Sequence, residues 1–268
     1  MFEIFIKKYI YNSFFAAIYR PKESKMLTIL STLGNNHNIK ITREDRKMPE
    51  RKEKTLKRSD ERPRPTLNLT RTVIREVFNY RSRPWDAIPY LHDHVRRHGD
   101  ELPYDEYDEI ADGVWVHISA YVSPTCKIDP PTIICGGARI CHYAHIEGSV
   151  IGAFATVGDL SHVKNSIMFD RSCLCGRNSL YSSILGYEAM IGDGTTVADS
   201  RLDGMNVTVS MPEGLYVLGR ERLGGIICDG VRIGANCIIN PGAVIDNDAR
   251  IFPLTSISGY VYPYSTIK

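Results

Sequence analysis

Large aliphatic residues recur at every sixth position in two long runs of the chain. The first run comprises Val116, Val122, Ile128, Ile134, Ile140 and Ile146, and the second comprises Ile227, Ile233, Ile239, Ile245, Ile251 and Ile257. Neither an α-helix, with a period of about 3.6 residues, nor a flat strand, with a period of about two, produces this spacing. A six-residue step is typical of a β-solenoid, in which each short strand forms one side of a triangular prism. Chance spacing in a valine-rich sheet protein does not account for two unbroken runs of this length.

A smaller residue stands two positions before most of these large residues. The smaller residues are Ala120, Cys126, Thr132, Ala138, Ala144, Val231, Cys237, Ala243, Ala249 and Thr255. In a triangular coil the large residue points to the axis and the small one fits the tight corner. Stacked coils about 4.8 Å apart then hydrogen-bond like parallel strands.

The six-residue step continues between the two runs with one-residue slips. The aliphatic residues there are Ile151, Val157, Val163, Leu174, Leu180, Leu185, Ile191 and Val197. Glycine follows the aliphatic residue at Gly152, Gly158, Gly186, Gly192 and Gly234, where we predict turns with positive φ because glycine has no Cβ. We therefore expect an all-β fold, a parallel β-helix of hexapeptide repeats over residues 113–268.

Residues 202–225 interrupt the solenoid with a loop that has no six-residue step. The loop contains Pro212 and ends in the charged run Arg220, Glu221 and Arg222. A long excursion from a regular scaffold usually lies beside a ligand or a neighbouring subunit. We expect the same of this loop.

Residues 66–112 are predicted to form a short helical adaptor. Asn68 or Thr70 is a suitable N-cap, and apolar side chains then follow at helical spacing. The two apolar stripes comprise Leu69, Val73, Val77 and Phe78, then Ile88, Leu91 and Val95. Arg96, Arg97 and Gly99 are typical of a helix C-terminus. We expect Trp85 to pack this pair against the first coil, and the adaptor to close the open end of the core.

Residues 1–65 form a basic head. The net charge of the chain is +2, yet residues 1–64 carry 16 Lys and Arg against 8 Asp and Glu. Residues 40–64 offer almost nothing apolar to bury, so we expect disorder. Met26 and Met48 are alternative starts, so the head can be an over-extended reading of the gene. The acidic residues among the basic ones, without interleaved aromatic residues, argue against a nucleic-acid-binding arm, and the aromatic start resembles neither a signal peptide nor a membrane span.

The cysteines indicate a reducing, cytoplasmic location. There are seven, an odd number, and none lies in a CxxC pair. Cys126 and Cys237 occupy small corner positions, and Cys173 and Cys175 face the same side of a strand. We interpret all four as buried thiols and expect no metal site.

Three stretches carry a resemblance to a known family. They are HVKNSIMFDRS at 162–172, SSILGYEAMIGDGTTVADSRLDGMNV at 182–207 and NPGAVIDNDARIFPLTSISG at 240–259. They resemble the left-handed β-helix acetyltransferase domain of the bifunctional glucosamine-1-phosphate N-acetyltransferase / UDP-N-acetylglucosamine pyrophosphorylase. The motif Pro84-Trp85-Asp86-Ala87-Ile88-Pro89 is similar to one in short stand-alone proteins of that family. The resemblance covers the chain from the adaptor to its end.

This resemblance implies a left-handed coil, a homotrimer, a small-molecule acceptor and acetyl-CoA as cosubstrate. Nothing upstream of Val114 resembles the family's nucleotidyltransferase domain, so we expect no pyrophosphorylase activity. Only one of six functional positions of the family carries the same residue here. Lys164 falls on the phosphate-binding lysine, whereas the other five positions hold Gly176 for the base, Ser179 for the tyrosine, Met190 for an asparagine, Met205 for the second lysine and Glu147 for the arginine.

These departures change the expected substrate. Amine acetylation needs a base, which contributes about 10²- to 10⁴-fold in rate, and a phosphate site needs positive charge. Glu147 in place of an arginine reverses that charge. We therefore expect an acyl-CoA-dependent acyltransferase whose acceptor, an amine or a hydroxyl, is not glucosamine-1-phosphate.

Other residues can supply the missing chemistry. His162 and Lys164 flank the inward Val163, so both project from the outer face as a candidate base and anion-binding group. Arg177 and Asn178, beside the position of the lost base, are candidate substrate-binding residues. Arg220 and Arg222 in the loop are candidates for binding the phosphates of CoA.

Two alternatives stay open at this point. One is a catalytically silent, trimeric binding or scaffold protein that keeps the prism without the chemistry, which the five differing positions favour. The other is a zinc hydratase of the γ-carbonic-anhydrase type, in which His142, His145 and His162 hold the ion. The spacing of these histidines does not resemble that family's motif.

Overall fold

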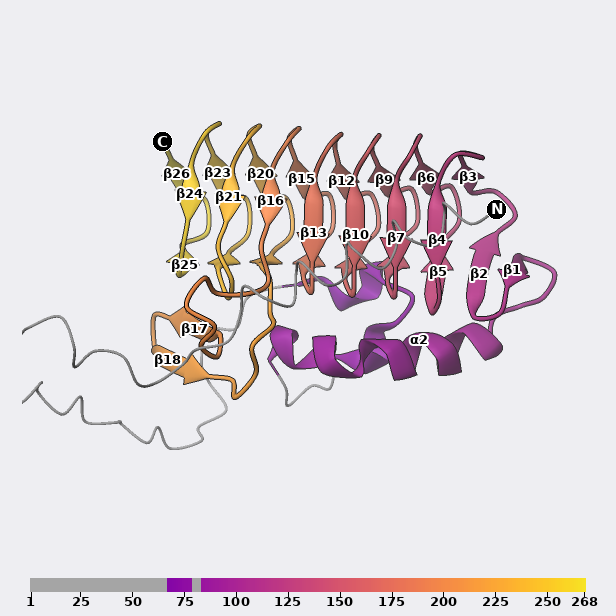
Figure 1. Ribbon diagram of the computed structural model, residues 1–268, viewed down its shortest axis with the longest axis horizontal. Helices are drawn as coiled ribbons and strands as arrows, with labels where there is room; N and C mark the ends of the chain where they lie inside the picture. The colour runs from indigo at the N-terminus through magenta and orange to yellow at the C-terminus, as the bar shows by residue number, and fades with distance from the viewer. Residues whose placement is uncertain (1–66, 79–82) are drawn as a thin grey trace, which may run out of the picture. The chain divides into compact units, whose positions relative to one another are not determined.

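The solenoid predicted from the six-residue step is present. The computed structural model describes residues 67–78 and 83–268, so the predictions for the basic head lie outside the described residues. From Val114 onward the described chain winds into a parallel β-solenoid with three long sheets, one for each side of the prism (Figure 1). The predicted all-β, hexapeptide-repeat parallel β-helix is confirmed.

Each sheet stacks parallel strands from successive coils, and β1 adds an antiparallel strand at the edge of the nine-stranded sheet. The nine-stranded sheet contains β1 (Tyr107–Ala111), β2 (Val114–His117), β5 (Thr132–Ile134), β8 (Val150–Ile151), β11 (Ile167–Met168), β14 (Ile184–Leu185), β19 (Ile226–Ile227), β22 (Val244–Ile245) and β25 (Tyr260–Val261). The eight-stranded sheet contains β3 (Tyr121–Val122), β6 (Arg139–Ile140), β9 (Thr156–Val157), β12 (Cys173–Leu174), β15 (Met190–Ile191), β20 (Arg232–Ile233), β23 (Arg250–Ile251) and β26 (Thr266–Ile267). The seven-stranded sheet contains β4 (Lys127–Asp129), β7 (His145–Glu147), β10 (His162–Lys164), β13 (Ser179–Tyr181), β16 (Thr196–Val197), β21 (Ile238–Ile239) and β24 (Ser256–Ile257).

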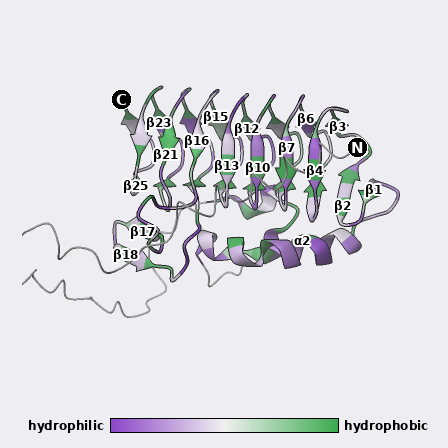
Figure 2. Cartoon of the chain, viewed as in Figure 1, coloured by the Kyte–Doolittle hydropathy of each residue, from purple (hydrophilic) through white to green (hydrophobic). Residues whose placement is uncertain are grey.

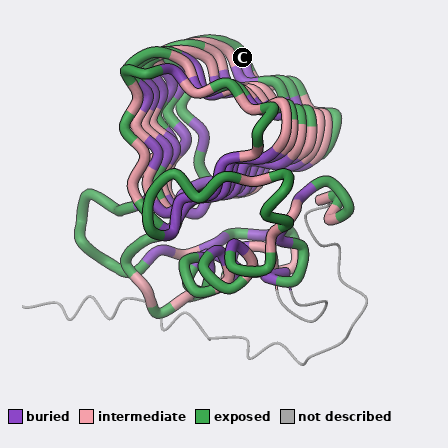
Figure 3. Tube along the Cα trace, turned by 90° about the vertical axis from the view of Figure 1, so that its right-hand side faces the viewer, coloured by how far each residue is buried: buried purple, intermediate pink, exposed green. Residues whose placement is uncertain are grey.

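The interior of the coil is filled by the aliphatic residues of the six-residue step. Viewed end-on, the buried positions line the inside of the triangular coil (Figure 3). On the seven-stranded sheet, for example, Ile146, Val163, Leu180, Val197 and Ile239 are fully buried in one column. The small residues at the corners, such as Ala138 and Ala243, are also buried in this core, as predicted.

The nine-stranded sheet is buried on its outer side as well. Its outward residues, which are Ile133, Val150, Ile167, Ile184, Ile226 and Val244, form a second hydrophobic cluster with the adaptor and the 202–225 loop. Figure 1 shows α2 (Leu91–Asp100) running along this side, and Figure 2 shows the mostly hydrophilic helix beside the hydrophobic strands. We expected the adaptor to close the end of the core. It covers the outer side of the nine-stranded sheet instead, because the apolar side chains on that side would otherwise be exposed to water.

The adaptor is less helical than its sequence predicts. Instead of a helix over the first stripe, there are two single turns of 3₁₀-helix, η1 (Leu69–Arg71) and η2 (Arg75–Val77), with Asn68 capping the first through the amide of Thr70. A longer 3₁₀ segment, η3 (Pro84–Tyr90), leads directly into α2. In the described part of the chain, no helix has both the length and the apolar character needed to cross a bilayer.

Two tight contacts fix the adaptor. Gly99 lies inside α2 rather than beyond its end, and a Cβ there would meet the ring of Trp115 at 2.4 Å. Trp85 is buried against Tyr216, with ring centroids 5.6 Å apart, and not against the first coil as expected. Tyr216 belongs to a hairpin, β17 (Thr208–Met211) and β18 (Gly214–Val217), that occupies the middle of the 202–225 loop. The loop therefore packs against the adaptor.

The glycines after the aliphatic residues have a different role from the one predicted. The φ angles at Gly152, Gly158 and Gly234 lie outside the positive region, so the turn prediction is wrong there. A Cβ would instead lie 2.5–2.6 Å from backbone or proline atoms of the next coil at all three positions. Positive φ falls on the corner residues further on, including Phe154 and Leu160. These glycines permit close stacking of neighbouring coils.

Candidate functional site

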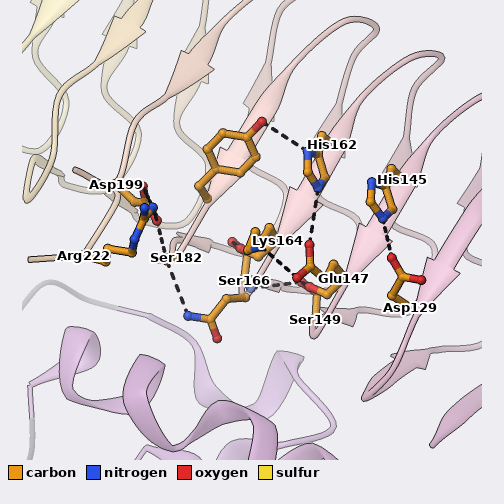
Figure 4. A network of polar contacts seen from close by, with 12 residues as sticks. Asp129, His145, Glu147, Ser149, His162, Lys164, Ser166, Ser182, Asp199 and Arg222 are labelled. Atoms are coloured by element: carbon orange, nitrogen blue, oxygen red, sulfur yellow. Dashed lines mark hydrogen bonds and ion pairs between the residues drawn. The ribbon is translucent and has the colours of Figure 1, made fainter. Parts of the chain in front are cut away.

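The outer face of the seven-stranded sheet carries a row of imidazole, carboxylate and ammonium groups. Strand alternation buries Ile146 on β7 and Val163 on β10, so the residues on both sides of each project outward. Parallel pairing then places His162 beside His145 and Lys164 beside Glu147 on neighbouring strands. Figure 4 shows these side chains on the adjacent strands. The predicted outward placement of His162 and Lys164 is therefore found, with two partners that the sequence analysis did not pair with them.

Glu147 joins the two predicted residues. Its Oε1 lies 2.8 Å from Lys164 Nζ, and its Oε2 lies 3.9 Å from His162 Nε2. The hydrogen bond from Lys164 lowers the pKa of Glu147, so the carboxyl is ionised at neutral pH. This carboxylate stands at the position where the resembling family has an arginine, and it compensates the charge of the one lysine that matches.

His162 lies between two aromatic partners. Its ring stacks on that of His145, with centroids 4.4 Å apart and an angle of 8° between the planes, and its Nδ1 lies 3.2 Å from the Tyr181 hydroxyl. Burial lowers the pKa of His162, and the adjacent His145 lowers it further. Its Nε2 atom is buried and has no hydrogen bond within the described residues. His162 is thus a neutral imidazole with one nitrogen facing Tyr181 and the other facing Glu147.

A pocket of ≈ 560 Å³ opens between this sheet and the adaptor. Its lining residues are Ile88, Pro89, His92, Lys164, Asn165, Tyr181, Ser182, Asp199 and Arg222. His162 is outside this lining, so Tyr181 is the group that connects the pocket to the histidine. The pocket brings together Lys164 and Arg222, which the sequence analysis had assigned to different ligands.

The two loop arginines have different surroundings. Arg222 donates to the buried Asp199, at 3.0 and 3.3 Å, and its side chain is 69% exposed at the pocket. Arg220 donates to the carbonyl oxygen of Trp85 at 2.8 Å and lies 3.7 Å from Asp86. Arg220 therefore ties the loop to η3, and Arg222 is the one placed to meet a ligand.

The residues proposed beside the lost base do not meet the pocket. Asn178 is 1% exposed, and its side chain donates to Cys175 O and accepts from Thr195 N, at 2.9 and 2.6 Å. The bond from Thr195 joins Asn178 to the next coil, and the buried side chain offers no surface to a substrate. Arg177 is exposed at the corner before β13, whereas the pocket lies at the opposite end of that strand.

His142 stands apart from the other two histidines. Its Nδ1 lies 2.9 Å from Ser123 Oγ and 3.2 Å from Thr125 Oγ1, both on an earlier coil. Among the described residues, the group with atoms close enough to share a metal ion is His145, Glu147 and His162. The three-histidine site considered from the sequence does not form.

Tyr181 and Asp199 are the residues that the sequence analysis missed. Both lie in the stretch that carries the family resemblance. Tyr181 follows Lys164 by 17 residues, which equals one coil here, so counting coils along the outward row would have placed it beside Lys164. Asp199 follows the last aliphatic residue before the loop, and its burial depends on contacts that the six-residue step does not encode.

Comparison with known proteins relates the sequence of this parallel hexapeptide solenoid to acetyltransferases. No family model matches it. The putative uncharacterized acetyltransferase YaiX of Escherichia coli K12 is 29% identical over 124 residues, which is 46% of this chain and 46% of YaiX. The bifunctional sugar-1-phosphate nucleotidylyltransferase/acetyltransferase of Sulfurisphaera tokodaii is 32% identical over 97 residues, 36% of this chain and 24% of that protein.

Bifunctional protein GlmU of Methanococcus maripaludis strain C5 is also similar, at 32% identity over 104 residues, 34% of this chain and 25% of that protein. The chain's homologues are thus acetyltransferases, and the predicted resemblance is confirmed. The matches span less than half the length of each of these relatives. Among solved structures, AntD, an N-acyltransferase from Bacillus cereus in complex with dTDP and 3-hydroxybutyryl-CoA, matches 62% of this chain and 81% of that chain, with 16% identity and a TM-score of 0.34.

Proposed function

We propose that the protein is an acyl-CoA-dependent acyltransferase of the sugar N-acetyltransferase type. It transfers the acetyl group of acetyl-CoA to an amine or hydroxyl of a small molecule other than glucosamine-1-phosphate. The acetyltransferase relatives support the class of reaction. The observation that carries the assignment is the pocket in which Tyr181 links the outward His162 to two cationic side chains, Lys164 and Arg222.

His162 acts as the base through Tyr181. The acceptor amine attacks the thioester carbonyl, and the Tyr181 hydroxyl accepts the amine's proton while its own proton passes to His162 Nδ1, 3.2 Å away. Glu147, on the far side of the ring at 3.9 Å from Nε2, stabilises the imidazolium that forms. The carbon–sulfur bond breaks, and the CoA thiolate that leaves takes up the proton. His162 then returns to its neutral form.

Lys164 and Arg222 are cationic side chains that line the pocket, and we assign one to each substrate. Arg222 is the more exposed, and it has the fork geometry that suits a phosphate, so we assign it to CoA. Lys164 is adjacent to Tyr181 across the strands and therefore faces the acceptor. Because Glu147 and Asp199 already pair with these two cations, the pocket suits a weakly charged acceptor better than a phosphate.

A homotrimer completes the proposal. At the corner where the eight- and seven-stranded sheets meet, the large apolar side chains of Tyr143 and Leu160 are exposed on neighbouring coils. Exposed apolar side chains on a regular prism are the kind of surface that another copy of the chain covers.

Substitution of the relay tests this mechanism. His162→Ala and Tyr181→Phe are each expected to lower kcat for acetyl transfer by about 10²- to 10⁴-fold with little change in the KM for acetyl-CoA, because each removes proton transfer rather than cofactor binding. His142→Asn is the matched control, since His142 is a neighbouring exposed histidine outside the pocket. The measurement is release of the CoA thiol. Equal rates for His162→Ala and the control would contradict the assigned base.

A further inference from the structure

We infer that the outer row of the seven-stranded sheet binds a divalent transition-metal ion, such as Zn²⁺, between His145, Glu147 and His162. Each residue offers a ligand atom, and these atoms lie within 4.8 Å of one another. Two imidazole nitrogens and one carboxylate oxygen, with a fourth position open, are a ligand set that suits zinc. This inference does not rest on the proposed acyltransferase activity, although it uses the same His162.

The backbone already has the spacing that such a site needs. His145 and His162 are direct neighbours on parallel strands, and Glu147 is on the same face two residues after His145. Ligands about 2.0–2.2 Å from a tetrahedral ion lie roughly 3.3–3.6 Å from one another. To bind one ion, the two stacked rings, whose centroids are 4.4 Å apart, must tilt toward each other.

One ligand atom is already turned toward the site without a partner. His162 Nε2 is buried, faces Glu147 Oε2 and makes no hydrogen bond among the described residues. A buried polar atom without a partner is unfavourable, because it loses its hydrogen bonds to water and gains none in the fold. A metal ion at this position would satisfy it, because an imidazole with its proton on Nδ1 presents a lone pair at Nε2.

Each of the three ligands is also held by a second group. Tyr181 lies at hydrogen-bonding distance from His162 Nδ1, and Lys164 donates to the other oxygen of Glu147. Asp129 Oδ2 lies 2.6 Å from His145 Nε2, where it can accept a hydrogen bond from the ring and leave the lone pair of Nδ1 for the ion. Supporting hydrogen bonds of this kind orient metal ligands, and their loss typically lowers metal affinity by about 10- to 100-fold.

The proposed site revises the expectation of no metal, and it differs from the three-histidine alternative by using Glu147 in place of His142. It also has a consequence for the pocket. An ion on His162 Nε2 keeps the ring's proton on Nδ1, so the same ring cannot accept a further proton through Tyr181. Metal occupancy and base catalysis would therefore exclude each other.

The test is a metal titration of the full, tag-free chain after removal of metals with a chelator. Co²⁺ is expected to bind one ion per chain with the visible absorption of a tetrahedral site, and Zn²⁺ is expected to displace it. His145→Ala and Glu147→Ala are expected to weaken binding by at least about 100-fold, and Tyr181→Phe, which keeps the shape of the ring, by about 10- to 100-fold. His142→Asn is expected to bind as the unaltered chain does.

Several results would overturn the inference. One is the absence of tetrahedral Co²⁺ absorption. Another is an affinity for Zn²⁺ that is the same in His145→Ala, Glu147→Ala and the unaltered chain. A Tyr181→Phe chain that keeps its melting temperature and binds Co²⁺ with undiminished affinity would exclude the supporting role of Tyr181. All these readouts measure metal binding directly, so they stand whether or not acetyl transfer is found.

Discussion

Ile239→Asp is expected to destabilise the solenoid by several kcal/mol, enough to remove its cooperative melting transition. Ile239 is 0% exposed and stacks between Val197 and Ile257 on the axis of the coil, where a carboxylate has no polar partner. Burial of an unpaired carboxylate is among the substitutions with the largest known effects on stability. The measurement is thermal unfolding followed by circular dichroism.

Ile238→Asp is the matched control, because Ile238 is the preceding residue on the same strand and is 51% exposed on the outer face. It should melt within a few degrees of the unaltered chain, since surface substitutions usually change the free energy of unfolding by less than about 0.5 kcal/mol. If both variants melt alike, the assignment of alternate residues to the core and the surface is wrong.

Glucosamine-1-phosphate is expected to give no measurable acetylation. The family's base position holds Gly176, whose amide donates to Asp193 Oδ1 at 2.7 Å, and no side chain is available there. Loss of a base alone lowers a rate by about 10²- to 10⁴-fold. In addition, Glu147 pairs with Lys164 at 2.8 Å, so a phosphate would have to displace a carboxylate from the one matching lysine. The measurement compares CoA release with glucosamine-1-phosphate and with amino sugars that carry no phosphate. Efficient turnover of the phosphate would show that the alignment of functional positions is wrong.

The sequence predicts the inside of the coil better than its surface. The six-residue step follows from the geometry of a three-sided core, and Ile146, Val163 and Ile239 lie where the step places them. The covered face could also have been found, because pairs such as Ile133–Ile134 and Val150–Ile151 are typical of a parallel strand buried on both sides. That signal identifies which face is covered, and the adaptor is the apolar segment available to cover it.

The site was only partly predictable. Alternation about Val163 is enough to place His162 and Lys164 outward. Their partners Glu147 and Tyr181 are 15 to 19 residues away, and pairing them requires the number of residues in each coil, which varies with the slips in the step. The roles of Asn178 and Arg220 depend on tertiary contacts. Asn178 bonds to the next coil, and Arg220 bonds to the adaptor. Neither contact leaves a periodic trace in the sequence.

The central claim is that the solenoid is an enzyme that uses acetyl-CoA. In the most direct measurement, the full chain is incubated with acetyl-CoA and a panel of amino sugars, and N-acetylated products are detected by mass spectrometry. Binding of acetyl-CoA is measured in parallel by calorimetric titration. We expect saturable binding of acetyl-CoA and at least one acetylated product, which disappears when His162 is replaced by alanine and persists in His142→Asn. Absence of both binding and product across the panel would contradict the claim and favour a silent scaffold.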